Sequence, residues 1–135
     1  MEKVNEALMI AIKYSKIAYQ PYSNFSVGAC VCCDGELFGG CNVENASYGG
    51  TICAERTAIV KAVSEGKKKI DFIVIYTPTK TYSAPCGFCR QFINEFATED
   101  TQIYSFNKNM EFGLWTMEEI LPNAFGPNNL EKENR

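Results

Sequence analysis

Apolar and small residues recur with a helical period in three stretches of the chain. In the first, residues 4–19, they return every three or four positions, and the pattern stops before Pro21. The second stretch runs from Cys53 to Gly66, and the third follows Pro85. We therefore expect three helices, of which the second and the third begin beside a cysteine.

Apolar runs of strand length lie between the expected helices. The runs 25–33 and 36–42 flank Asp34-Gly35, a dipeptide typical of a hairpin turn. Further strands are expected at 72–76, 102–106 and 111–115. The pattern Thr116-Met117-Glu118-Glu119 matches a capping box and predicts a short fourth helix. This alternation of strands and helices indicates a single α/β unit.

The composition is that of one globular domain. Of 135 residues, 46% are apolar and 21% are charged, and we expect one domain over 1–135 with a polar tail, 126–135, that frays. No apolar run is long enough to span a membrane. The formal net charge of −3 argues against a nucleic-acid partner, because such partners are bound largely through Lys and Arg.

The cysteine content bears on the cellular compartment. The N-terminus lacks the basic start and apolar stretch of a secretory signal, so we expect a cytoplasmic protein. Seven cysteines in such a chain are expected to be thiols and metal ligands rather than disulfides. Four of them lie in the apolar runs and are expected to behave as small buried hydrophobes rather than as a second metal cluster: Cys30, Cys32, Cys33 and Cys41.

The other three cysteines, Cys53, Cys86 and Cys89, have the pattern of a zinc site. The chain has no histidine, so a zinc site in it would rest on sulfur. Structural zinc normally takes four protein ligands, whereas catalytic zinc takes three and leaves the fourth position to water. Glu55 lies two residues after Cys53 and would be able to take a proton from that water. The pattern therefore predicts a hydrolytic centre.

The helix starts and one arginine bear on the charge of this centre. Helix N-termini carry partial positive charge and free amide donors, which favour thiolates, and two helices meeting nose to nose would close the site. Cys53, the Ala54 amide and the Glu55 side chain would then address one pocket. Three thiolates around Zn²⁺ leave an excess negative charge, and we expect Arg56 to balance it, with Arg90 as a weaker candidate.

Five blocks of sequence resemble the short, homotetrameric type of cytidine deaminase. They are Pro21–Ala29, Asn42–Tyr48, Cys53–Arg56, Pro85–Gln91 and Leu121–Phe125, in family order. The resemblance implies a three-layer α/β/α fold on a mixed five-stranded sheet flanked by helices. It implies one Zn²⁺ per subunit and hydrolysis of cytidine and 2′-deoxycytidine to uridine and 2′-deoxyuridine with release of ammonia, a reaction of pyrimidine salvage. Glu55 would serve as base and then as acid.

The resemblance also assigns residues to the nucleoside. Asn42 and Glu44 lie two apart, point to one side of an extended segment, and would bind the ribose 3′-hydroxyl. A carboxylate there would repel a 3′-phosphate, which favours a free nucleoside. Phe25 would form an aromatic wall against the base, whereas Phe125 would reach it from a neighbouring subunit and Tyr48 would lie near that boundary. Active sites would thus be completed across a homotetramer.

Three alternatives stay open at this point. A structural zinc module would need a fourth ligand, and neither Glu55 nor a spare cysteine is obviously placed to supply it. A deaminase of nucleic acids or nucleotides is disfavoured by the net charge and by Glu44. A deaminase of a related nucleoside such as blasticidin S is disfavoured by the Phe125 block.

Overall fold

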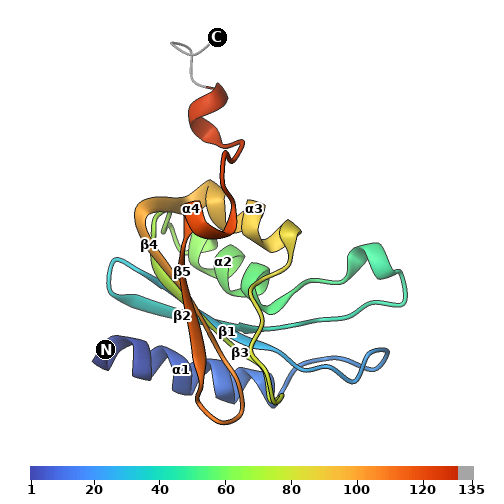
Figure 1. The fold of residues 1–135 in the computed structure, drawn as a ribbon. Coiled ribbons are helices and arrows are strands. Elements are labelled where there is room, and N and C mark those ends of the chain that lie inside the picture. The colour runs from blue at the N-terminus through green and yellow to red at the C-terminus, as the bar shows by residue number, and fades with distance from the viewer. Residues whose placement is uncertain (131–135) are drawn as a thin grey trace.

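In the computed structural model, which describes residues 1–130, the chain forms three layers (Figure 1). A mixed sheet of five strands in the order β2-β1-β3-β4-β5 forms the middle layer. Its strands are β1 (Gly28–Cys33), β2 (Glu36–Cys41), β3 (Ile70–Tyr76), β4 (Ala97–Phe106) and β5 (Phe112–Thr116). The helices are α1 (Glu2–Ser15), α2 (Ala54–Ser64), α3 (Gly87–Phe96) and α4 (Met117–Ile120), with single turns at η1 (Tyr48–Gly50) and η2 (Pro127–Leu130). This is the α/β/α architecture expected from the sequence.

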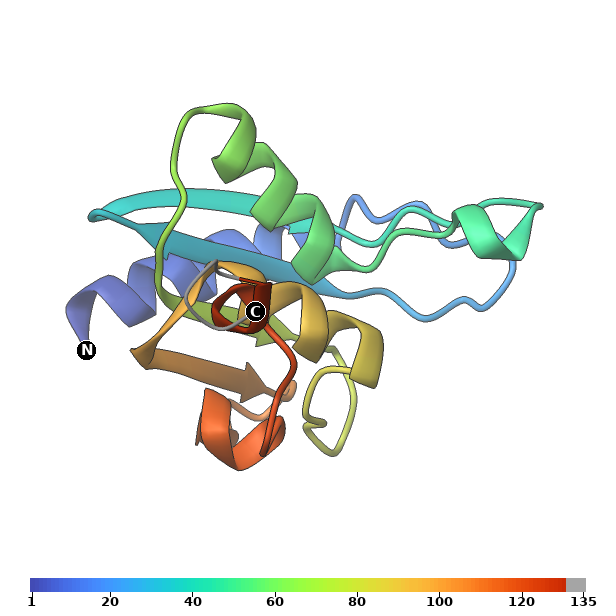
Figure 2. The ribbon, with the colours of Figure 1, turned by 90° about the horizontal axis from the view of Figure 1, so that it is seen from above.

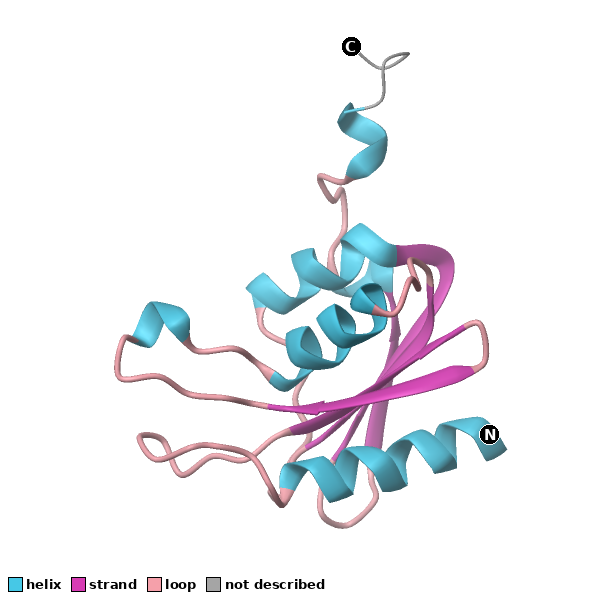
Figure 3. Cartoon of the chain, turned by 180° about the vertical axis from the view of Figure 1, so that it is seen from behind, coloured by secondary structure: helices cyan, strands magenta, loops and turns pink. Residues whose placement is uncertain are grey.

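The two faces of the sheet are covered by different helices. Helix α1 lies on one face, and α2, α3 and α4 lie on the other (Figure 3). Strand β1 is buried on both faces and sends Ala29 and Val31 toward α2 while Cys30 and Cys32 pack in the α1 layer. Burial raises the pKa of the Cys30 thiol to about 12. These strand cysteines are therefore protonated core residues.

Local chemistry fixes the hairpin and the close approach of α1. Asp34 and Gly35 both have positive φ, 53° and 79°, and this is the conformation of a two-residue turn between antiparallel strands. A Cβ on Gly28 would lie 1.8 Å from the carbonyl oxygen of Ala11, so only glycine lets the sheet lie this close to the helix.

The capping box predicted at Thr116 is formed with Glu119.

Tertiary pairing moves several element boundaries from their predicted positions. Helix α1 ends at Ser15 rather than at 19, because the backbone of Tyr19 bonds instead to Asn42 and Glu44. Strand β1 starts at Gly28 rather than at 25, and β4 starts at Ala97 rather than at 102. The segments that follow α1 and β2 project together beyond one end of strands β1 and β2 (Figure 2), held by bridges from Val43 to Tyr19 and Ile52.

Two further expectations concern membranes and the C-terminal tail. Within residues 1–130, no helix is long and apolar enough to cross a membrane. Of the tail expected to fray, residues 127–130 form the turn η2, which stands off the body of the molecule (Figure 1). Residues 131–135 lie outside the part that the structure describes.

Candidate metal centre and substrate pocket

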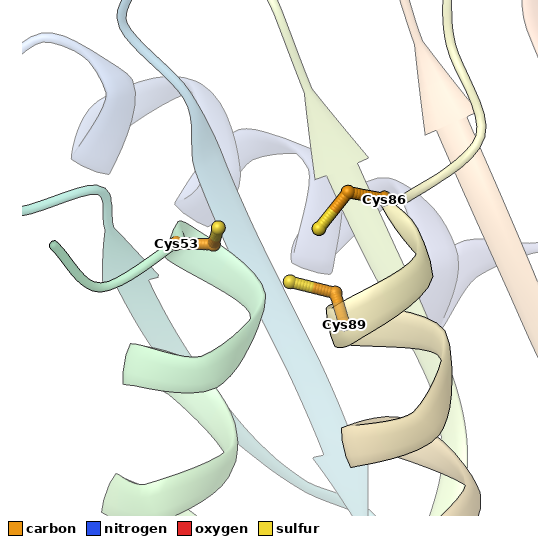
Figure 4. A group of neighbouring side chains, drawn as sticks. All are labelled: Cys53, Cys86 and Cys89. Atoms are coloured by element: carbon orange, nitrogen blue, oxygen red, sulfur yellow. The ribbon is translucent and has the colours of Figure 1, made fainter. Parts of the chain in front are cut away.

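Three cysteine sulfurs converge between the starts of two helices. Cys53 is the N-cap of α2, Cys86 is the N-cap of α3, and Cys89 lies in the first turn of α3. Their Sγ atoms lie within 4.8 Å of one another, and the side chains point toward one another in Figure 4. The two helices lie side by side with their N-termini at the same end (Figure 4), rather than meeting nose to nose. Because Cys53 and Cys86 cap these N-termini, the partial positive charge of both helices lies next to the sulfurs.

The three sulfurs fit a zinc site that leaves one position open. Thiolates are the ligands that zinc prefers, and they lie close enough together to share one ion. Within residues 1–130, no fourth Cys, His, Asp or Glu joins this group. Cys89 is fully buried whereas Cys86 is exposed, so the site is anchored in the core and open on one side. A three-ligand set of this kind is typical of catalytic rather than structural zinc.

Electrostatics favour a thiolate at Cys53. The Cys89 thiol donates a hydrogen bond to it and Arg56 lies beside it, and together they lower the pKa of Cys53 to about 5. The same hydrogen bond raises the pKa of Cys89, because its proton is the one shared. The cluster thus holds negative charge even before a metal displaces the remaining protons.

Arg56 contacts the sulfur cluster, whereas Arg90 does not. The Nη2 atom of Arg56 lies 3.7 Å from the Sγ of Cys53 and donates a hydrogen bond to the carbonyl oxygen of Thr51 at 3.0 Å. Arg90 donates instead to the carbonyl oxygens of Pro85 and Ile120, at 2.7 and 2.9 Å. The sequence-based suggestion that Arg90 balances the sulfur charge is therefore wrong. Its guanidinium instead links α3 to the segment before it, at Pro85, and to α4, at Ile120.

Glu55 lies in the wall of a cavity next to the cluster. Only 6% of its surface is exposed, and burial raises the pKa of its carboxyl to about 7, with the nearby Cys53 thiolate acting in the same direction. A carboxyl with this pKa can both accept and donate a proton at neutral pH.

The cavity itself has a volume of about 460 Å³, and it is mostly apolar with a few convergent polar groups. Besides Cys53, Glu55 and Cys86, the cavity is lined by four residues that were expected from the sequence to bind the substrate: Phe25, Asn42, Glu44 and Ala54. Further lining residues are Ser23, Val27, Thr51, Ile75, Thr77, Ser83, Ala84 and Pro85. The cavity therefore reaches Cys53, Cys86 and Glu55, so a molecule bound in it would lie next to the sulfurs and the carboxyl.

Asn42 and Glu44 both face the cavity, and both are held by the neighbouring loop. The Asn42 amide accepts from the Val27 N–H at 2.9 Å and donates to the Phe25 carbonyl at 2.8 Å, which fixes the wall of the pocket. The Glu44 carboxylate accepts hydrogen bonds from the N–H groups of Tyr22 and Ser23, at 3.0 and 3.1 Å, and from the Ser23 hydroxyl. The Ser23 hydroxyl is the main cause of a lowered pKa for Glu44, so this carboxylate stays ionised.

Tyr48 and Phe125 lie outside the cavity in the single chain. Tyr48 lines a second, shallower hollow with Tyr22, Ser23, Glu44 and Thr51. Phe125 is 59% exposed, and its carbonyl oxygen accepts hydrogen bonds from the side-chain amides of Gln91 and Asn94. Both rings are thus presented to the outside rather than to this chain's own sulfur cluster.

The roles of two residues at the site were not predicted from the sequence. Ser23 lies within the Pro21–Ala29 block, but its role as the partner of Glu44 depends on residues far apart in the chain. Phe88, inside the Cys86–Cys89 turn, places its ring against the guanidinium of Arg56. Its place between two metal ligands was visible in the sequence and suggested an effect on the pocket wall, but Phe88 does not line the cavity and contacts Arg56 instead.

The chain is similar to known deaminases along most of its length. A family model described as the cytidine and deoxycytidylate deaminase zinc-binding region matches residues 1–105. A cytidine deaminase of Halalkalibacterium halodurans is 46% identical over 116 residues, which cover 85% of this chain and 88% of that protein. Another, of Mycoplasma pneumoniae, is 46% identical over 110 residues, covering 80% and 83%.

Solved structures agree in fold. The crystal structure of cytidine deaminase from Burkholderia pseudomallei matches with a TM-score of 0.85 and 38% identity, covering 90% of this chain and 98% of that one. That of Mycobacterium tuberculosis matches with a TM-score of 0.77 and 33% identity, covering 90% and 96%. With its three converging cysteines and buried glutamate, the chain belongs to the zinc-binding cytidine and deoxycytidylate deaminase family.

Proposed function

We propose that this protein hydrolyses cytidine and 2′-deoxycytidine to uridine and 2′-deoxyuridine with release of ammonia, a reaction of pyrimidine salvage. The observation that carries the proposal is the buried Glu55 carboxyl beside three cysteine sulfurs that share one open-sided site. Membership in the deaminase family supports the same reaction. Cys53, Cys86 and Cys89 would hold one Zn²⁺, which as a Lewis acid makes water a nucleophile at neutral pH.

Glu55 moves the protons of the reaction. It accepts a proton from the attacking water and delivers it to N3 of the cytosine ring, then takes the remaining proton from the hydroxyl formed at C4 and delivers it to the departing amine, and so acts as base and then as acid. Its pKa near 7 keeps both protonation states available. Ala54, in the first turn of α2, lines the same cavity, and its backbone amide would supply a fixed donor for the substrate.

The other polar groups of the cavity select a free nucleoside. The hydrogen bond from Ser23 keeps Glu44 ionised. The Glu44 carboxylate accepts a hydrogen bond from the sugar 3′-hydroxyl, with Asn42 beside it. An ionised carboxylate at that point repels a 3′-phosphate, so a nucleotide within DNA or RNA is rejected. Phe25 borders the same cavity and provides an apolar wall for the base. The net charge of −3 agrees with a small-molecule substrate rather than a nucleic acid.

The active unit is a homotetramer in this proposal, and the protein works in the cytoplasm. Support for the assembly comes from the exposed aromatic rings of Tyr48 and Phe125, which a neighbouring subunit would cover. Support for the compartment comes from the seven cysteines, which are all free thiols. Light scattering gives the subunit number, and Phe125→Ala is expected to raise KM because the neighbour's ring no longer closes the pocket.

The reaction is tested by the loss of cytidine's ultraviolet absorbance and by the ammonia released. We expect turnover in the zinc-loaded protein, loss after chelation and recovery with added Zn²⁺, whereas zinc-loaded Glu55→Gln loses activity by several orders of magnitude. Blasticidin S, dCMP and a cytosine-containing oligonucleotide are assayed in parallel. Bound zinc without ammonia release from cytidine would point to a structural zinc module, and faster turnover of blasticidin S would reassign the substrate.

A further inference from the structure

Phe88 is an exposed aromatic residue placed between two metal ligands. It follows Gly87 in the first turn of α3, so Cys86 precedes it and Cys89 comes directly after it. Of its surface, 64% is exposed, which is unusual for a phenylalanine with no place in the core. Its ring extends toward α2, and the ring centroid lies 4.3 Å from the Cζ atom of Arg56. This contact joins the α3 ligand pair to the α2 side of the metal site.

Few groups hold the Arg56 guanidinium in place. Its Nη2 atom donates to the Thr51 carbonyl oxygen and lies farther from the Cys53 sulfur, and its other contact within the site is with the sulfur of Cys89. Its Nε atom is buried and has no hydrogen-bond partner in the described part of the chain. An arginine side chain has several rotatable bonds and loses conformational freedom when it is fixed at one point. The ring of Phe88 supplies the missing support from one face.

An aromatic face and a guanidinium attract each other in two ways. The negative face of the ring draws the cation to distances below about 6 Å, and the 4.3 Å contact lies inside that range. The ring also keeps water from the covered side of the guanidinium, and a drier cation interacts more strongly with the thiolate beside it. Both effects favour the position of the Arg56 guanidinium next to the sulfur of Cys53.

We propose that Phe88 is a positioning residue that holds Arg56 against the ligand sulfurs and thereby slows the release of the metal. The inference rests on the proposed zinc site and adds to it a residue outside the ligand set. A phenylalanine that served only as apolar cover would be replaced without loss by another apolar side chain of similar size. A phenylalanine that acts through Arg56 requires an aromatic ring, and it has no effect once the arginine is gone.

The test compares four variants with the wild type: Phe88→Leu, Phe88→Tyr, Arg56→Gln, and Arg56→Gln combined with Phe88→Leu. Zinc release is followed by the colour of a chelating dye added in excess. We expect Phe88→Leu to release zinc about two to five times faster, which is the effect of losing one exposed cation–π contact, and Phe88→Tyr to match the wild type. In the Arg56→Gln background, Phe88→Leu is expected to change nothing.

A second readout reports on the sulfurs directly. In the Co²⁺-substituted protein, thiolates that lose a hydrogen-bond donor transfer charge to the metal at lower energy. The charge-transfer band of Phe88→Leu should therefore move to longer wavelength, as in Arg56→Gln, while that of Phe88→Tyr stays in place. For cytidine, Phe88→Leu should lower kcat and leave KM unchanged, because Phe88 does not line the cavity.

The outcomes separate this inference from the function on which it rests. The positioning role is overturned if Phe88→Leu and the wild type release zinc at the same rate and show the cobalt charge-transfer band at the same wavelength. An equal effect of Phe88→Leu with and without Arg56 overturns it too, because the ring would then act by packing alone. A wild-type protein that binds no zinc at these cysteines contradicts the proposed function as well.

Discussion

Replacement of Glu55 by glutamine should stabilise the metal-free protein at neutral and alkaline pH. The wild-type carboxyl is buried next to the Cys53 thiolate, so its ionised form lacks the solvation it would have in the unfolded chain. Glutamine has the size of the protonated acid but cannot ionise. The variant therefore removes the electrostatic penalty and keeps the shape of the side chain.

The size of the effect follows from the pKa of Glu55. Its ordinary value of 4.5 is raised to about 7 in the folded protein. Because the folded pKa is the higher one, the favourable contribution of the protonated acid is fully present below pH 4.5 and is lost as the pH rises through 7. At 1.36 kcal/mol for each pKa unit, the loss amounts to about 3 kcal/mol above pH 8.

The assay is urea unfolding of chelator-treated wild type and Glu55→Gln at several values between about pH 5 and pH 8.5. The free energy of unfolding of the variant, relative to the wild type, should grow by about 2–3 kcal/mol over this interval. Glu95, an exposed glutamate on α3, gives a matched control, since Glu95→Gln should leave the difference nearly constant. A pH-independent difference for Glu55→Gln would refute the reasoning, because the acid would then be solvated or paired.

Three further predictions concern the charge of the metal centre, the pocket rim and the strand thiols. Arg56→Ala should release zinc about tenfold faster than the wild type, measured with a chelating dye, and an unchanged rate contradicts the charge-balancing role. Ser23→Ala should raise the KM for cytidine about threefold or more with kcat nearly unchanged, because Glu44 loses its hydroxyl donor; an altered kcat alone would argue against this. Cys30 in the folded, metal-free protein should resist iodoacetamide at pH 7.5, because its pKa is about 12, and modification found by peptide mass spectrometry would disagree.

The elements and the metal ligands were predictable because their signals are local. Helical and strand periods lie within ten or so residues, and the Cys86–Cys89 spacing describes a single turn. The helix starts at Cys53 and Cys86 could likewise be read from the apolar pattern that follows each of them. The resemblance then supplied the three-layer architecture, which the structure confirms.

What could not be predicted depends on residues distant in sequence. Helix α1 stops early because Tyr19 pairs with the segment after β2, and no local pattern carries that pairing. Arg90 turned toward Pro85 and Ile120 rather than toward the sulfurs, since the layout of α3 and α4 decides which acceptors it reaches. The support that Ser23 gives to the pocket rim belongs to the same class of long-range contact.

X-ray absorption at the zinc edge tests most directly whether the metal is held by three sulfurs with one position open. The structure predicts three sulfur neighbours at about 2.3 Å, from Cys53, Cys86 and Cys89, and one oxygen or nitrogen neighbour at about 2.0 Å. Four sulfur neighbours at about 2.3 Å would contradict this arrangement, because a fully caged ion leaves no place for the water that hydrolysis consumes.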